Sequence, residues 1–178
     1  MALGRPIQTT MSDADTQLDI PRTMVGSARH IFETHLATEL VQVGQMTLRE
    51  FIMDGLMQKE NRYIKEVTVW GDHDAHIIIP FRADVAEFVA HTTLGVDEVK
   101  MAAFEGNDLI NESTNELTNQ LAGCFRNILS RDEINCRLKP PRRLQELELA
   151  EWLNKASYRF IFKFQLIDNS LHVIYLRD

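Results

Sequence analysis

The sequence has few cysteines and no long apolar run, and both absences exclude whole classes of protein. Its two cysteines, Cys124 and Cys136, lack the spacing of a metal-binding or redox motif. They are too few for a disulfide scaffold and are typical of a reducing compartment. No apolar run approaches the roughly 20 residues that a membrane-spanning helix requires, and the N-terminus lacks the layout of a signal peptide. We therefore expect a cytoplasmic location without a membrane partner.

Basic residues are also scarce relative to acidic ones. The chain has 19 Lys and Arg against 26 Asp and Glu, and its net charge is −7. Nucleic acid is excluded as the main partner, because a phosphate backbone requires a basic surface. The hydrophobic fraction of 44% is ordinary for a globular protein. Residues 1–21 are polar and aperiodic and predict a disordered tail, so we expect a single domain over 22–178.

Apolar periodicity and turn residues predict helices and strands of an α+β protein. Thr47 and Glu50 form a capping box at the start of one helix, and residues 71–74 form the turn of a β-hairpin. Helices are expected over 23–39, 47–59, 82–94 and 107–130. Strands are expected over 63–70, 75–81, 133–138, 155–167 and 171–176, with 144–153 left open as a short helix or an irregular loop. This order predicts an antiparallel β-sheet with long helices packed on one face.

The predicted helix over residues 107–130 has two different faces. At about 100° per residue, one stripe is apolar and is expected to face the core, with Thr114 and Phe125 at its margin. The core stripe consists of Ile110, Leu117, Leu121, Cys124 and Ile128. The opposite face consists of Glu112, Asn115, Glu116, Asn119, Gly123 and Arg126. A glycine inside a helix costs about 1 kcal/mol relative to alanine and is easier to accept where another molecule must come close to the backbone.

A row of Glu and Asn opposite an apolar stripe is typical of any solvated helix, but this row carries a further pattern. The run from Glu116 to Gly123 resembles the phosphatase helix of the CheX/CheC/FliY family, whose members remove the phosphoryl group from the chemotaxis response regulator CheY. The order of elements over roughly 47–176 is also similar to that of CheX. The resemblance therefore implies a CheX/CheC-like fold and a phosphatase of a two-component signalling pathway.

The resemblance assigns a role to each residue of the row. It implies that Asn119 orients the water that attacks the aspartyl phosphate, and that Glu116 pairs with the active-site lysine of the regulator. Glu112, Asn115 and Gly123 would contact the partner. The partner would be a phosphorylated CheY-like receiver domain that supplies the Mg²⁺, so that this chain binds no cofactor. A single motif matches CheX better than CheC and implies a homodimer.

Three positions depart from the family pattern. Glu112 stands where Ser or Asp is common, Asn115 where glycine is common, and Cys124 and Phe125 follow Gly123 where Asn and Ala often do. The central pair is intact, but these departures leave a second function open. That alternative is a non-catalytic adaptor or dimerisation module that binds a receiver domain.

Three other groups of residues have competing interpretations. The run from Asp72 to His76 is either a metal site or an ordinary hairpin turn. Arg142 and Arg143, with Lys139 nearby, are either an anion contact or part of a solvated loop. The aromatic residues at alternate positions from Tyr158 to Phe164 are expected to be sheet core, because basic residues for a nucleic-acid stacking platform are missing.

Overall fold

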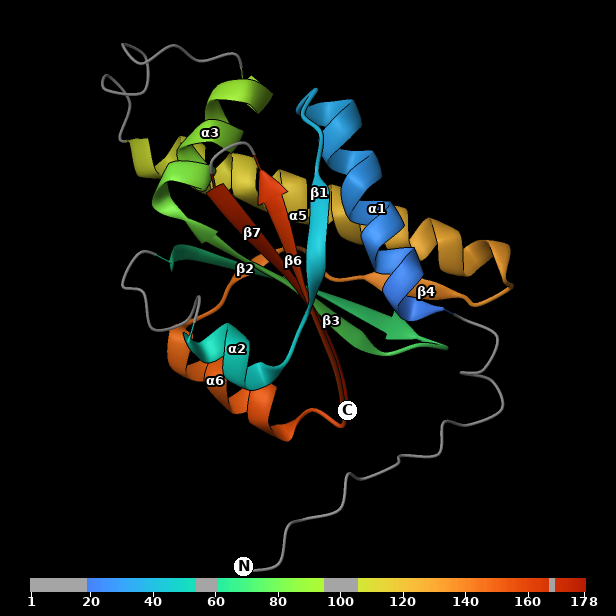
Figure 1. The fold of residues 1–178 in the computed structure, drawn as a ribbon. Helices are drawn as coiled ribbons and strands as arrows, with labels where there is room; N and C mark the ends of the chain where they lie inside the picture. Colours follow the sequence, from blue (N-terminus) through green and yellow to red (C-terminus); the bar gives the residue numbers. More distant parts are fainter. Residues whose placement is uncertain (1–18, 54–60, 95–105, 167–168) are drawn as a thin grey trace, which may run out of the picture.

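The computed structural model describes residues 19–53, 61–94, 106–166 and 169–178 (Figure 1). The helices are α1 (Ile20–His35), α2 (Leu48–Phe51), α3 (Ala83–Leu94), α5 (Gly106–Arg131) and α6 (Glu146–Lys155). The strands are β1 (Val41–Met46), β2 (Asn61–Gly71), β3 (Ala75–Arg82), β4 (Cys136–Leu138), β5 (Arg142–Arg143), β6 (Tyr158–Leu166) and β7 (Asn169–Arg177). No helix in these ranges is long and apolar enough to cross a membrane.

The strands form one antiparallel sheet in the order β1-β6-β7-β3-β2-β4, and the short β5 also pairs with β2. Figure 1 shows α1, α3 and α5 on one side of this sheet and α2 and α6 on the other. The predicted fold class is confirmed, since the long helices α1, α3 and α5 pack on one face. The two short helices cover part of the opposite face in addition.

Side-chain alternation along the strands divides the core between the two faces. Ile77 and Ile79 of β3 pack in the larger cluster with α1, α3 and α5, and Ile78 packs in the smaller cluster with α2 and α6. All three isoleucines are fully buried. The predicted strand over 75–81 is therefore confirmed, and it is covered on both faces.

Helix α1 differs from its predicted range at both ends. It begins at Ile20, inside the range assigned to the tail, because the Asp19 side chain accepts a hydrogen bond from the Arg22 backbone amide at 3.0 Å. Pro21 fits the first turn, where a backbone N–H has no partner within the helix. The helix ends at His35, and Ala37 follows with a φ of 47°. Residues 1–18 of the predicted tail lie outside the described residues.

The capping box at Thr47 is confirmed. Thr47 N donates to Glu50 Oε2 at 2.7 Å, and Glu50 N donates to Thr47 Oγ1 at 3.2 Å. The predicted helix extends over 54–59, which lie outside the described residues.

Several other boundaries differ from the prediction. Strand β1 was not predicted at all. Strand β4 is shorter than its predicted range, and Glu133 within that range has a φ of 61°. The open segment 144–153 is helical from Glu146 onward as part of α6, which buries Leu149 and Leu153 and continues to Lys155, the first residue of the predicted strand 155–167.

Helix α5 confirms the predicted long helix, but its buried face is rotated from the predicted stripe. Phe125 and Leu129 are fully buried, whereas Cys124 and Ile128 are half-buried. The helix contacts α1 and α3 as well as the sheet. Phe125, which was placed at the margin, packs against the rings of His73 and Tyr175.

Candidate functional site

The exposed face of α5 carries the row of residues that the sequence singles out. Glu112 and Glu116 are exposed, and Asn115 and Asn119 are half-buried. All four line one open groove of about 560 Å³. The other residues that line it are Thr93 of α3, Asp108, Asn111 and Ser113 of α5, and Pro141 before β5. A carboxylate and a carboxamide three residues apart, Glu116 and Asn119, thus share one accessible surface of the helix.

Gly123 lies one turn beyond this groove and does not line it. Nothing within the described part of the chain lies within 4 Å of the place that a Cβ at Gly123 would occupy. The internal packing of α5 therefore does not require a glycine at this position.

Glu116 has a partner on its own helix. Gln120 Nε2 donates a hydrogen bond to Glu116 Oε1 at 2.8 Å. Residues four apart on an exposed helix surface gain only a few tenths of a kcal/mol from such a pair. Glu116 can therefore exchange this bond for a stronger one at low cost.

Two oxygen atoms at the groove lack a hydrogen-bond partner within the described residues. Asn115 Oδ1 and Thr93 Oγ1 are both buried, and neither forms a hydrogen bond. Most buried polar atoms in proteins are paired, so two unpaired oxygen atoms at one groove are an unusual feature of its wall. The sequence predicted Asn115 at this surface, whereas Thr93 comes from the neighbouring helix and was missed.

A buried lysine supports the groove from the sheet. Lys65 of β2 is 2% exposed, and its Nζ donates to Asn111 Oδ1 at 2.9 Å. Burial, and in second place the nearby positive charge of Arg143, lowers the pKa of Lys65 to about 8. Lys65 was not among the residues predicted from the sequence. The available signal was a charged side chain on the same predicted strand face as Tyr63 and Val67.

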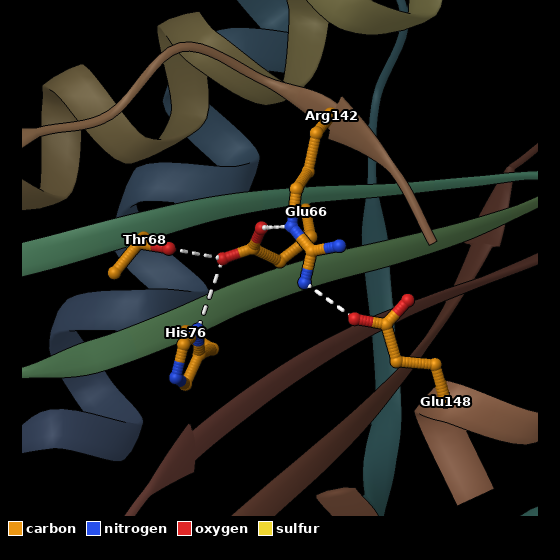
Figure 2. A network of polar contacts seen from close by, with 5 residues as sticks. All are labelled: Glu66, Thr68, His76, Arg142 and Glu148. Atoms are coloured by element: carbon orange, nitrogen blue, oxygen red, sulfur yellow. Dashed lines mark hydrogen bonds and ion pairs between the residues drawn. The ribbon is translucent and has the colours of Figure 1, made fainter. Parts of the chain in front are cut away.

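The next residue on β2, Glu66, points to the opposite face of the sheet and gathers a polar network (Figure 2). Glu66 accepts hydrogen bonds from His76 Nδ1 at 2.9 Å, Thr68 Oγ1 at 2.7 Å and Arg142 Nε at 2.9 Å. Burial raises the pKa of Glu66, but the hydrogen bonds from His76 and Thr68 and the charges of His76 and Arg142 outweigh it. The resulting pKa lies below its usual value.

This network decides the role of Arg142, which the sequence left open as an anion contact or a loop side chain. Arg142 Nη2 also donates to Glu148 of α6 at 2.7 Å, and its guanidinium group lies over the Trp152 ring. Arg142 of β5 therefore binds to both β2 and α6 and holds β5 between them. Because Pro141 immediately precedes β5, the same ion pairs hold one wall of the groove.

The alternative of a metal site at residues 72–76 has no support in the geometry. His73 shares a hydrogen bond with Tyr175 in the larger core cluster, whereas His76 bonds to Glu66 on the other face of the sheet. Among the described residues, no group of three or more His, Cys, Asp or Glu side chains is arranged to hold a metal ion.

The predicted aromatic row of β6 does belong to the sheet core. Phe162 and Phe164 are buried, and Phe160 packs against the same cluster.

The fold of this chain, but not its sequence, is similar to that of known proteins. No protein-family model matches the chain, and no curated protein matches it in sequence.

Solved structures do match in three dimensions. A CheX–CheY complex with BeF₃ and Mg²⁺ from Borrelia burgdorferi matches at a TM-score of 0.70 and 19% identity, over 90% of this chain and 99% of that chain. CheX from Desulfovibrio desulfuricans matches at 0.65 and 14% identity, over 90% of this chain and 100% of that chain. A CheC-like protein from a Shewanella species matches at 0.60 and 16% identity, over 89% and 97%. Similarity at these identities establishes the fold, and function must be argued from the site.

Proposed function

We propose that this chain, which has the fold of the CheX and CheC proteins, is a phosphatase for the aspartyl phosphate of a CheY-like receiver domain. The observation that supports this proposal is the position of Glu116 and Asn119, one turn apart on the accessible face of α5 at a single groove. A CheX of similar fold forms a complex with CheY in Borrelia burgdorferi.

Asn119 is the proposed catalytic residue. Its carboxamide offers both a donor and an acceptor and carries no charge that would repel a phosphoryl group. It holds a water molecule in line with the phosphorus atom. The water oxygen bonds to phosphorus as the bond to the aspartyl oxygen breaks, and inorganic phosphate leaves. Such positioning supplies several kcal/mol of barrier lowering.

Glu116 is the proposed recognition residue. It is exposed, and its bond to Gln120 is easily exchanged, so it can pair with the active-site lysine of the receiver. Glu112, Asn115 and the backbone at Gly123 complete the contact surface. The receiver supplies the phosphorylated aspartate and its Mg²⁺, so the proposal requires no metal ligands from this chain.

The same proposal includes the setting in which the protein works. We expect a homodimer, as the single motif implies, that acts in the cytoplasm on a chemotaxis pathway or a related two-component pathway. Each subunit would present its own α5 groove to one receiver.

One observation favours a second candidate, a non-catalytic adaptor that binds a receiver domain. Asn115 adds bulk beside Glu116 where the family commonly has glycine. An adaptor would bind the phosphorylated receiver without accelerating its decay.

The experiment that separates these candidates is a phosphate-release assay. A CheY-like receiver is phosphorylated with a small-molecule phosphodonor in Mg²⁺, and release is followed with and without the purified chain. We expect acceleration by the parent protein and a loss of about 100-fold in Asn119→Ala. Asn127→Ala is the matched control, since Asn127 is an exposed residue of the same helix outside the groove. Equal rates of phosphate release with Asn119→Ala and with Asn127→Ala would show that Asn119 has no role in the reaction.

A further inference from the structure

Lys65 is an unusual residue for the centre of a strand. It is 2% exposed and lies on the face of β2 that carries the buried residues Tyr63 and Val67. Removing an ammonium group from water is costly unless polar partners replace the water. Lys65 Nζ donates to Asn111 Oδ1 at 2.9 Å, so the buried cation is directed at helix α5.

Asn111 is one of the residues that line the groove. It immediately precedes Glu112 and lies one turn before Asn115 and two turns before Asn119. The contact between Lys65 and Asn111 therefore links the middle of the sheet to the helix segment that carries the proposed recognition and catalytic residues.

That segment of α5 has an unusual hydrogen-bond pattern. Three buried hydroxyl groups donate to backbone carbonyls one turn earlier: Ser113 Oγ to Leu109 at 2.8 Å, Thr114 Oγ1 to Ile110 at 2.6 Å, and Thr118 Oγ1 to Thr114 at 2.7 Å. Such bonds compete with the helical ladder, slightly destabilise a helix and often bend it. The first half of α5 consequently depends on contacts with the rest of the fold to hold its position.

Glu66, the neighbour of Lys65, supports a different wall of the same groove through its contact with β5. Its ion pair with Arg142 holds β5, and Pro141 just before β5 lines the groove. Two consecutive residues of β2 thus fasten two different parts of one site, Lys65 through α5 and Glu66 through β5.

We propose that Lys65 is a positioning residue for the groove. By holding Asn111 against the sheet, it fixes the first half of α5 so that Glu116 and Asn119 meet a partner in one arrangement. This inference rests on the proposed phosphatase function and adds a residue that contacts neither the partner nor the phosphoryl group.

A positioning role and a purely structural role predict opposite results for Lys65→Met. The methionine side chain has a similar length and removes the buried charge, so thermal stability should stay the same or rise. A positioning role nevertheless predicts a lower catalytic rate at saturating receiver, by about tenfold or more. Lys155→Met is the control, because Lys155 is an exposed residue of α6 on the far face of the sheet, and its rate should equal that of the parent.

The double variant tests whether Lys65 and Asn111 act as a unit. If they do, Lys65→Met combined with Asn111→Ala should be no slower than the slower single variant, within about twofold. Rate losses that multiply would overturn the proposal, and so would a Lys65→Met protein with the parent rate. A Lys65→Met protein whose rate loss is accompanied by a lower melting temperature would also overturn it.

Amide hydrogen exchange gives a readout that does not depend on catalysis. At pH 7, residues 112–119 should exchange about tenfold faster in Lys65→Met than in the parent, although the melting temperature of the variant is equal to or above that of the parent. Unchanged exchange in this segment would refute the inference. If the parent fails to release phosphate, the phosphatase proposal is wrong, and the exchange rates still decide whether Lys65 holds α5.

Discussion

Substitution of Glu116 by glutamine tests the proposed contact with the receiver. The change keeps the shape of the side chain and removes its charge. A charge-assisted hydrogen bond to a lysine is worth about 1.5–3 kcal/mol. Glu116 must first release the bond from Gln120 Nε2 at 2.8 Å, an exposed pair worth about 0.2–0.5 kcal/mol. The net loss on Glu116→Gln is therefore about 1–3 kcal/mol, which corresponds to about a 5- to 100-fold weaker complex.

The assay is titration of the phosphorylated receiver at low and at high salt. The difference between parent and Glu116→Gln should shrink as salt rises, because screening weakens a contact between charges at the surface. Glu151→Gln is the control, since Glu151 is an exposed residue of α6. Affinities for the parent and Glu116→Gln within twofold of each other at low salt would refute a role for this carboxylate in binding.

Three further predictions concern stability. The unfolding free energy of Lys65→Met in urea at pH 7 should exceed that of the parent by up to about 3 kcal/mol. Below the folded pKa of about 8, Lys65 is charged in both the folded and the unfolded protein, and its charge is buried only in the folded one. This gain in unfolding free energy should vanish as the pH rises from about 8 to about 10.5. A gain that does not change with pH would contradict the burial of the Lys65 charge. Glu66→Gln should lose about 2 kcal/mol at pH 7. Because the pKa of Glu66 is lowered in the fold, this loss should shrink as the pH falls below the unfolded pKa and disappear below the folded one. A loss that does not shrink as the pH is lowered from 7 through the acid range would count against it. Gly71→Ala should lower the melting temperature, since Gly71 has a φ of 129° and a Cβ there would lie 2.6 Å from the Asn135 carbonyl oxygen. Gly26→Ala, with nothing within 4 Å on the exposed side of α1, should raise it, and equal shifts in both variants would contradict the strain at Gly71.

Periodic patterns within one segment made part of the fold predictable from sequence. The long helix α5 and the β2–β3 hairpin follow from local apolar spacing and turn residues. Strand β1 was missed because it pairs with β6, more than a hundred residues away, at the edge of the sheet. Its exposed residues Val41 and Val43 alternate with glutamines and Gly44 and give a weak signal.

The candidate site, like the fold, was predictable from the sequence only where its residues belong to one segment. The row from Glu112 to Asn119 lies on one helix, so its spacing alone places those residues on one face. Lys65 is 46 positions from Asn111, and Glu66 is 76 positions from Arg142. Helical or strand periodicity carries no information at such separations. Thr93 reaches the groove only because α3 packs against α5. Phe125 is buried against the rings of His73 and Tyr175, which are far from it in the sequence.

The most direct test of the account is the rate of receiver dephosphorylation at saturating concentrations of Asn119→Ala. We predict that this variant binds the phosphorylated receiver with the affinity of the parent, while the saturated complex loses phosphate at the spontaneous rate of the free receiver. A saturated Asn119→Ala complex that releases phosphate as fast as the parent complex would contradict the central claim that this carboxamide orients the attacking water.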